Sequence, residues 1–166
     1  MSMLQKKICM IGDFSVGKTS LVARYVHQAF SEKYLTTVGV KIDTKTITLP
    51  SGDIKFILWD IAGADKLTTA SMTYLRGAAG YLLVVDGTRL PTWESALNLH
   101  QSVMQQIGKK PFLVLLNKAD LQAQWEITDA LLAPQREQGW QFLETSAKEG
   151  LNIEEAFFQL AMQLTG

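Results

Sequence analysis

The sequence predicts an α/β fold in which a six-stranded, mostly parallel sheet is covered by helices on both faces. The first observation is alternation, because short apolar runs typical of strands are separated by longer segments with apolar residues at helical spacing. The second is that most connections between these runs are long enough to hold a helix, and helical crossovers join parallel strands. The third is the turn sequence Pro50-Ser51-Gly52-Asp53, which divides residues 40–60 into two arms and predicts one antiparallel edge strand.

Each element is expected from its own pattern. Strands are short apolar runs bounded by polar or turn residues, and we expect them at about 5–11, 40–49, 54–60, 80–86, 111–116 and 140–143. Helices are expected from apolar residues at helical spacing, at about 17–29, 68–78, 92–107, 126–136 and 152–164. Asn152 is placed to cap the last helix, whose pattern is the clearest: Ile153, Ala156, Phe157, Leu160, Ala161 and Leu164.

Length and composition restrict the class of protein. The 166 residues predict a single domain, residues 1–166, that is long enough for a full core. Lys plus Arg and Asp plus Glu are equal at 16 each, so no net field attracts nucleic acid or anionic lipid. No apolar run has the length of a membrane span, and the single cysteine, Cys9, excludes an internal disulfide. We therefore expect a cytoplasmic monomer.

The loop between the first predicted strand and helix is the most informative segment. It matches the phosphate-binding pattern G-x-x-x-x-G-K-[ST], as Gly12-Asp13-Phe14-Ser15-Val16-Gly17-Lys18-Thr19. The bland alternative is a glycine turn followed by a surface lysine, but the flanking strand and helix favour a P-loop, whose N–H groups and helix N-terminus bind phosphate. Lys18 is expected to reach the β- and γ-phosphates, and the Thr19 hydroxyl to coordinate Mg²⁺. The nucleotide contacts expected here are Asp13, Phe14, Ser15, Val16, Gly17, Lys18, Thr19 and Ser20.

A second polar loop predicts the base. Asn117-Lys118-Ala119-Asp120 follows an apolar run, at a strand end where α/β sheets bind ligands. The Asp120 carboxylate can accept from both N1–H and the 2-amino group of guanine, whereas adenine would leave that charge unpaired. Lys118 can lay its stem on the base, and Asn117 can bond N7 and brace the loop. Alone, the same residues could form a polar turn.

Two further strand ends complete the predicted site. Glu144-Thr145-Ser146-Ala147-Lys148 follows a short apolar run, and the Ala147 N–H is the natural donor to guanine O6, with Ser146 and Lys148 beside it. Asp60-Ile61-Ala62-Gly63 follows another run. Asp60 is expected to hold Mg²⁺ through water, and the Gly63 N–H to sense the γ-phosphate. A strand-end Asp followed by Gly is otherwise an ordinary turn.

Taken in order, these motifs resemble those of the small GTPases over nearly the whole chain. Within that family the chain is similar to the Rab branch, in the residues Gly12-Asp13, Val16-Gly17-Lys18-Thr19-Ser20-Leu21, Thr37-Val38-Gly39-Val40 and Trp59-Asp60-Ile61-Ala62-Gly63. The segments Gly12-Asp13-Phe14 and Tyr34-Leu35-Thr36-Thr37-Val38-Gly39-Val40-Lys41 are also similar to Rab-like GTPases seen in bacteria. The resemblance implies a P-loop NTPase G domain. It also implies that Thr37 joins the Mg²⁺ shell in the triphosphate state, that Phe30 lies beside the guanine, and that Tyr34 closes over the phosphates. Without the resemblance, Phe30 would be a core residue at a helix end.

Two positions depart from the family pattern. Position 64 usually holds a glutamine that orients the attacking water, and here it is Ala64, which cannot hydrogen-bond water. Asp65 is adjacent and could take over that role. Phe14 stands where most relatives have glycine or serine, and its ring would either crowd the space beside the γ-phosphate or fold back onto switch II. The expected catalytic set is Lys18, Thr37, Gly63 and a degenerate Ala64.

The sequence thus predicts a GTP- and Mg²⁺-binding switch with slow intrinsic hydrolysis. A GTP-binding interaction module with negligible turnover is the alternative, which Ala64 and Phe14 favour. A nucleotide kinase would share the P-loop, but N-K-x-D and S-A-K argue against it. An effector, an exchange factor and an activating protein are expected to contact residues 30–40 and 61–72. The terminal sequences Met1-Ser2 and Gln163-Leu164-Thr165-Gly166 carry no myristoylation glycine or prenylatable cysteine, so no membrane anchor is expected within this chain. Either a lipidated tail has been removed, or the protein reaches membranes only through partners, if at all.

Overall fold

The structure is a computed structural model, and it describes residues 4–27, 40–61, 63 and 69–165. One sheet has the strand order β2-β3-β1-β4-β5-β6. Its strands are β1 Leu4–Gly12, β2 Val40–Leu49, β3 Gly52–Ile61, β4 Ala78–Asp86, β5 Phe112–Asn117 and β6 Phe142–Glu144. The helices are α1 Lys18–His27, α2 Thr69–Tyr74, α3 Leu90–Ile107, α4 Asp129–Glu137, α5 Ile153–Thr165 and the short 3₁₀ helix η1 Ala119–Gln124.

The sheet has five parallel strands and one antiparallel edge strand. β1 lies at the centre and pairs in parallel with both β3 and β4, and β5 and β6 continue the parallel order. β2 is antiparallel to β3, and the register Leu49↔Gly52 leaves Pro50 and Ser51 as the turn. The predicted fold class and the predicted hairpin are both confirmed.

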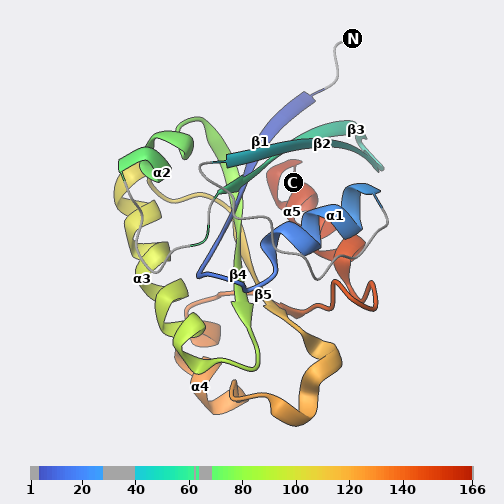
Figure 1. The fold of residues 1–166 in the computed structure, drawn as a ribbon. Coiled ribbons are helices and arrows are strands. Elements are labelled where there is room, and N and C mark those ends of the chain that lie inside the picture. The colour runs from blue at the N-terminus through green and yellow to red at the C-terminus, as the bar shows by residue number, and fades with distance from the viewer. Residues whose placement is uncertain (1–3, 28–39, 62, 64–68, 166) are drawn as a thin grey trace.

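Helices cover both faces of this sheet. Figure 1 shows α1 and α5 on one side and α2, α3 and α4 on the other. The central strands are buried on both faces because successive side chains of a strand point to opposite sides. In β1, Ile8 and Met10 belong to the core under α1 and α5, whereas Cys9 and Ile11 belong to the core under α3.

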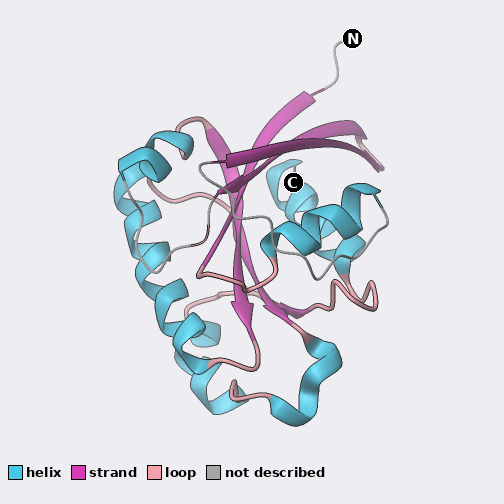
Figure 2. Cartoon of the chain, in the orientation of Figure 1, coloured by secondary structure: helices cyan, strands magenta, loops and turns pink. Residues whose placement is uncertain are grey.

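Each core is closed by apolar helix faces. On the first side Tyr25 of α1 stacks on Phe157 of α5, with ring centroids 3.9 Å apart. On the second side α3 buries Trp93, Leu99 and Val103. The helices lie against the sheet while the loops gather at its ends (Figure 2), and this leaves the loops after β1, β3, β5 and β6 free to form a site.

Several boundaries differ from the predictions. The predicted helix 68–78 is wrong at its end, because α2 stops at Tyr74 and β4 already begins at Ala78, after Gly77 with φ 77°. The fourth helix begins at Asp129 and not at 126, since the Thr128 hydroxyl caps it by accepting from the Leu131 N–H at 3.2 Å. The 3₁₀ helix η1 was not predicted.

The cap predicted for the last helix is also different. Asn152 directs its side-chain amide to the Glu144 carbonyl at 2.8 Å and has a left-handed backbone, φ 56°. Its backbone carbonyl, in contrast, accepts from the Ala156 N–H at 3.1 Å. Within the described ranges, no helix is both long and apolar enough to cross a membrane.

Candidate functional site

The polar loops predicted to bind nucleotide lie together at the carboxyl ends of the parallel strands. In Figure 1 the carboxyl ends of β1 and β4 point to the lower part of the view, where these loops gather. The phosphate loop has a strained backbone, since Gly17 has φ 103° and the non-glycine Ser15 has φ 57°. A Cβ on Gly17 would stand 2.3 Å from the Asn117 side-chain nitrogen, so only glycine fits where this loop approaches the base loop.

Lys18 is buried inside the phosphate loop. Its ammonium lies 3.4 Å from the Gly12 carbonyl oxygen and 3.3 Å from that of Asp13, and the residue is 6 % exposed. Burial lowers the pKa of Lys18, against the opposing pull of the Asp60 and Asp13 carboxylates. A desolvated cation held by weak carbonyl contacts is well placed to bind an anion such as phosphate.

Thr19 and Asp60 meet at the start of α1. The Thr19 hydroxyl donates to the Asp60 carboxylate at 2.6 Å, and Asp60 is 2 % exposed. Burial raises the pKa of Asp60, although Thr19 and Lys18 act in the opposite direction. A hydroxyl and a desolvated carboxylate form an oxygen donor pair that fits Mg²⁺, which is typically held by one or two protein oxygens plus phosphate.

Gly63 lies directly against the phosphate loop. A Cβ built on it would be 2.9 Å from the Asp13 carbonyl oxygen and 3.1 Å from the Lys18 ammonium. Any side chain here would push on the loop backbone. The absence of a side chain therefore lets the segment after β3 approach the phosphate loop and Lys18 closely.

Asn117 joins the base loop to the phosphate loop. Its side-chain amide donates to the Val16 carbonyl at 2.9 Å, and its side-chain oxygen accepts from the Thr145 hydroxyl at 3.1 Å. Asn117 and Thr145 are 2 % and 0 % exposed. Three separate loops are thus connected through one buried amide, which is the bracing role predicted for Asn117.

The loop after β6 holds one of the predicted base contacts, Asp120, in place. The Ser146 hydroxyl donates to the Asp120 carboxylate at 2.8 Å and fixes its direction. Ala147 follows and is 4 % exposed, while Lys148 is exposed. Lys118 has a left-handed backbone, φ 71°, at the turn into η1. Non-glycine residues in this conformation cost roughly 1–2 kcal/mol and often mark functional loops.

Asp86, at the end of β4, lies at the centre of the charges around these loops. Its carboxylate is 2.8 Å from the Lys118 ammonium and 2.9 Å from the Arg89 guanidinium, and the side chain is 1 % exposed. Lys118 also donates to the Ser15 carbonyl at 3.2 Å, and Arg89 to the Phe14 carbonyl at 2.6 Å. Two cations on one buried carboxylate therefore hold two consecutive carbonyl groups of the phosphate loop.

This arrangement stabilises the ionised form of Asp86. Burial by itself raises the pKa of this carboxyl, but hydrogen bonds from Lys118, Thr88 and Arg89 outweigh it and hold the pKa below its usual range. Asp86 is therefore charged at neutral pH and acts as a fixed acceptor beneath the site.

Asp13 uses its carboxylate within the protein. It accepts from the Phe14 N–H at 2.6 Å and from the Ser95 hydroxyl of α3 at 2.6 Å. Between these anchors and Arg89, the Phe14 backbone is fixed while its side chain is 60 % exposed. The ring is therefore exposed on the phosphate loop, and the Phe14 Cα lies 3.0 Å from a Cβ built on Gly63.

The structure brings most of the predicted site residues together, including Val16 and Ser20, which are both buried. Phe30, Tyr34, Thr37 and Ala64 lie outside the described residues. Sequence reasoning missed Asp86, Arg89, Ser95 and Thr145. Asp86 carried the same signal as Asp60, an aspartate at the end of a buried strand, and Thr145 lies inside the predicted motif Glu144-Thr145-Ser146-Ala147-Lys148. Nothing in the sequence marks Arg89 and Ser95.

Comparisons with known proteins agree with this geometry. The family model described as the Ras family matches residues 7–166. The chain is 34% identical over 160 residues to the Ras-related protein Rab-13 of Canis lupus familiaris, covering 95% of this chain and 79% of that protein. It is 34% identical over 160 residues to the GTP-binding protein ypt2 of Schizosaccharomyces pombe (95% and 80% covered). It is 35% identical over 156 residues to the Ras-related protein SEC4 of Saccharomyces cerevisiae (93% and 73% covered).

A small GTP-binding switch protein accounts for both the site and these similarities, and the chain belongs to the Ras family as a Rab-like small GTPase.

Proposed function

We propose that this protein binds GTP and GDP through the three connected loops, hydrolyses GTP slowly and signals through the difference between the two states. The observation that carries the proposal is the pair of hydrogen bonds by which Asn117 joins Val16 and Thr145. A ligand that contacts one loop must therefore meet the other two in fixed geometry. Phosphates would meet Lys18 and the loop N–H groups, and guanine would meet Asp120 and Ala147.

Mg²⁺ would be held by Thr19 and Asp60, with Thr37 joining them in the triphosphate state. When bound, it would neutralise phosphate charge and polarise the bond to be broken. Among the described residues no group of three or more His, Cys, Asp or Glu could hold a metal ion. Phosphate oxygens would therefore supply part of the coordination, so we propose a metal that binds together with nucleotide.

Slow hydrolysis is proposed because Ala64 offers no group to orient the attacking water. Lys18 and the backbone N–H groups, including that of Gly63, would still stabilise charge on the γ-phosphoryl group. The exposure of the Phe14 ring favours the first of its two alternatives, in which the ring crowds the space beside the γ-phosphate. This would be a second restriction on hydrolysis, since an activator's arginine would need the same space. We expect an intrinsic rate at or below ~10⁻⁴ s⁻¹.

Single-turnover hydrolysis of GTP by four proteins tests this proposal. The four proteins are the parent, Ala64→Gln, Phe14→Gly and the double variant. The parent should hydrolyse GTP slowly, and Ala64→Gln should raise the rate modestly. The double variant should raise the rate by more than the two single changes combined, because the two residues share one site. If the parent rate were well above ~10⁻⁴ s⁻¹ and unchanged by either substitution, another residue would have to orient the attacking water, and Asp65 is the first candidate. A parent with tight GTP binding and no turnover would favour the interaction module.

Partners are proposed to contact residues 30–40 and 61–72, and the structure suggests an adjoining apolar surface. Ile42 of β2 is 49 % exposed and lies directly across from Trp59 of β3. Trp59 in turn contacts Tyr74 of α2, with ring centroids 6.1 Å apart. Ile42 and Trp59 lie between the two proposed partner segments in sequence, and Tyr74 follows the second segment. An effector that contacts both segments would therefore cover them.

The remaining assignments are proposals of the same kind. We propose a single domain over residues 1–166 and a cytoplasmic monomer that does not bind nucleic acid, on the balance of 16 basic and 16 acidic residues. The relatives named above come from a mammal and two yeasts. Similarity to bacterial Rab-like GTPases stays a prediction.

A further inference from the structure

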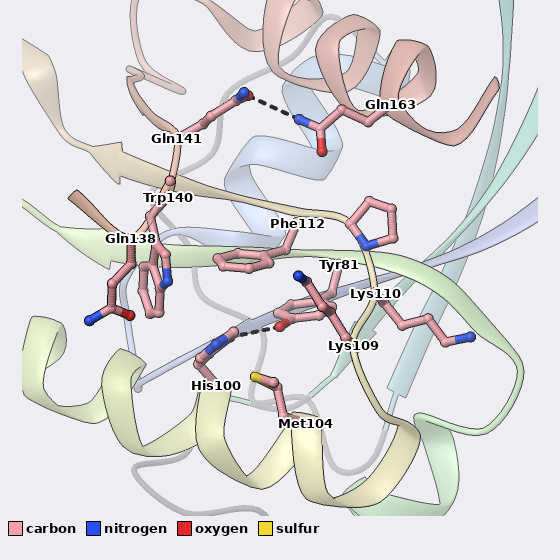
Figure 3. Close-up of a pocket in the computed structure, with 12 residues that line it drawn as sticks. Tyr81, His100, Met104, Lys109, Lys110, Phe112, Gln138, Trp140, Gln141 and Gln163 are labelled. Carbon is pink, nitrogen blue, oxygen red and sulfur yellow. Dashed lines mark hydrogen bonds between the residues drawn. The ribbon is translucent and has the colours of Figure 1, made fainter. Parts of the chain in front are cut away.

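A second hollow lies at the opposite end of the sheet from the nucleotide loops. It has a volume of about 860 Å³ and is formed by α3, the start of β5, and the segment that precedes β6 (Figure 3). Tyr81 and Phe112 in its wall are the first register pair between β4 and β5, whereas Asp86 and Asn117 at the nucleotide end are the last. The hollow is therefore separate from the site described above, and its size is that of small-molecule pockets.

The walls of this pocket are mainly aromatic rings. Phe112 lies parallel to Tyr81 with centroids 5.1 Å apart, and Trp140 meets Phe112 edge-on at 5.0 Å. His100 of α3 lies 4.5 Å from Trp140. Ring clusters of this kind often only close a core, but here Phe112, Trp140 and His100 are half-buried and Met104 beside them is 40 % exposed. Apolar ring surface is consequently left facing the hollow.

The polar pair formed by Tyr81 and His100 within the ring wall is neutral. The Tyr81 hydroxyl and His100 Nδ1 are 2.7 Å apart and satisfy each other. Burial raises the pKa of Tyr81 and lowers the pKa of His100, so neither ring carries a charge at neutral pH. This pair therefore neither attracts nor repels a charged ligand.

The charged residues that line the pocket are all basic. Lys109 and Lys110 follow α3 and border the hollow, and no aspartate or glutamate is among its lining residues. In Figure 3 the Lys109 side chain points toward the ring cluster, whereas that of Lys110 points away from it. Because the chain as a whole carries equal numbers of both charges, this one-sided lining is a local feature and favours an anionic ligand.

We propose that this pocket binds a small planar aromatic anion of the aromatic carboxylate class. The rings of the ligand would pack on Phe112 and Trp140, and its carboxylate would lie beside the Lys109 ammonium. Cation and ring wall together would select it over a neutral aromatic of the same shape, because each supplies a contact that the other cannot. The proposal is independent of GTP hydrolysis.

Two probes of the same shape test the proposal on the GDP-bound protein. Titration with 2-naphthoate and with the neutral 2-naphthylmethanol is followed by ¹⁵N–¹H NMR. We expect 2-naphthoate to shift the amides of Tyr81, His100 and Phe112 and the Trp140 indole signal, and to bind about threefold or more tightly than the alcohol. The preference should fall at high salt, since the lysine is at a solvent-accessible rim.

The two neighbouring lysines provide a matched pair of variants. Lys109→Ala should remove the preference for the carboxylate while the alcohol binds as before, and Lys110→Ala should keep most of it. Unchanged GDP affinity in both variants would show that the fold is intact. Equal binding of the two probes, a preference that survives Lys109→Ala, or shifts centred on the nucleotide loops would each overturn the proposal.

Discussion

Asp86 shows at the scale of a single residue how the two halves of the nucleotide site depend on each other. Lys118, whose stem is expected on the base, and Arg89, which holds the Phe14 carbonyl, both bind the same carboxylate. The direction of consecutive carbonyl groups in a phosphate loop sets the direction of the N–H groups between them. We therefore regard Asp86 as a positioning residue for phosphate and base contacts alike.

Asp86→Asn is expected to weaken the fold and the site together. The amide keeps the shape but loses the charge, so Lys118 and Arg89 lose their shared counter-ion. We expect a loss of about 1–3 kcal/mol in the free energy of unfolding and faster GDP release. Urea unfolding at fixed GDP and a fluorescent-GDP release assay measure the two effects. Asp53→Asn, at an exposed position of the hairpin, is the matched control and should change neither.

The stability contributed by Asp86 should also depend on pH. Its pKa is lowered in the folded protein, so the folded state favours the ionised carboxylate. That contribution is present above the unfolded pKa of about 3.9 and is lost as pH falls through the lower folded value. The difference in unfolding free energy between parent and Asp86→Asn should therefore be constant near neutral pH and shrink below about pH 4. A difference that grew on acidification would contradict the ion-pair account.

Asp120→Asn is expected to change base selectivity. A carboxylate accepts two hydrogen bonds from guanine, whereas an amide N–H can donate to the carbonyl that xanthine has in place of the 2-amino group. GDP and GTP should bind more weakly, and the affinity for xanthosine nucleotides should rise relative to theirs. A competition binding assay measures both changes. Because Ser146 donates to Asp120, Ser146→Ala should weaken guanine binding without creating a preference for xanthine. Unchanged guanine preference in Asp120→Asn would remove this residue from the base site.

Single residues were predictable where a motif fixes both residue type and position. Lys18, Thr19, Asp60, Asn117 and Asp120 could be singled out because each lies at or after the carboxyl end of a strand and carries a group that suits the predicted ligand. Arg89 and Ser95 were not, because each acts through a contact with the phosphate loop from 75 or 82 residues away. Contacts of that range follow from tertiary packing, and the local sequence carries no trace of them.

At the scale of elements, strands were predicted more accurately than short helices. The strand β2 spans the residues expected for it, and the Pro50-Ser51 turn marks its end. The helix α2 is shorter than expected because Gly77 takes a left-handed backbone before β4. The 3₁₀ helix η1 lacks any buried residue, so it has no apolar periodicity by which it could be found.

The strand β3 should transmit the state of the nucleotide to the Trp59 surface. Trp59 precedes Asp60, which would share the metal, and the Lys7 ammonium lies 3.6 Å from the centre of its ring. Loading with a GTP analogue in place of GDP should therefore change tryptophan emission. The change should be lost in Trp59→Phe and kept in Trp140→Phe, whose ring lies in the pocket at the far end of the sheet. A change that survives Trp59→Phe would place the response elsewhere.

At the scale of the whole molecule, the site exists only in the folded chain. Its loops follow β1, β3, β4, β5 and β6. Because these five strands are parallel and neighbours in the order β3-β1-β4-β5-β6, their loops meet at one end of the sheet. Alternating strands and helices predicted a parallel sheet, but not which strands are neighbours, because that order depends on how each crossover packs. Residues 12–20, 117–120 and 144–148 are distant in the unfolded chain, so nucleotide has no equivalent binding site there.

GDP should consequently stabilise the entire fold by mass action. A ligand that binds only the folded state adds about 1.4 kcal/mol for each tenfold rise in concentration above its Kd, which corresponds to about 3–6 °C in Tm for a chain of this size. Differential scanning fluorimetry should show this rise with GDP and not with ADP, because the proposed contact of Asp120 selects guanine. In Lys18→Ala the rise should begin only at much higher GDP, since the buried ammonium is the proposed main phosphate contact. Lys109→Ala, in the pocket at the other end of the sheet, should follow the parent curve. A Tm that did not respond to GDP, or that rose equally with ADP, would mean that the three loops do not act together as a guanine nucleotide site.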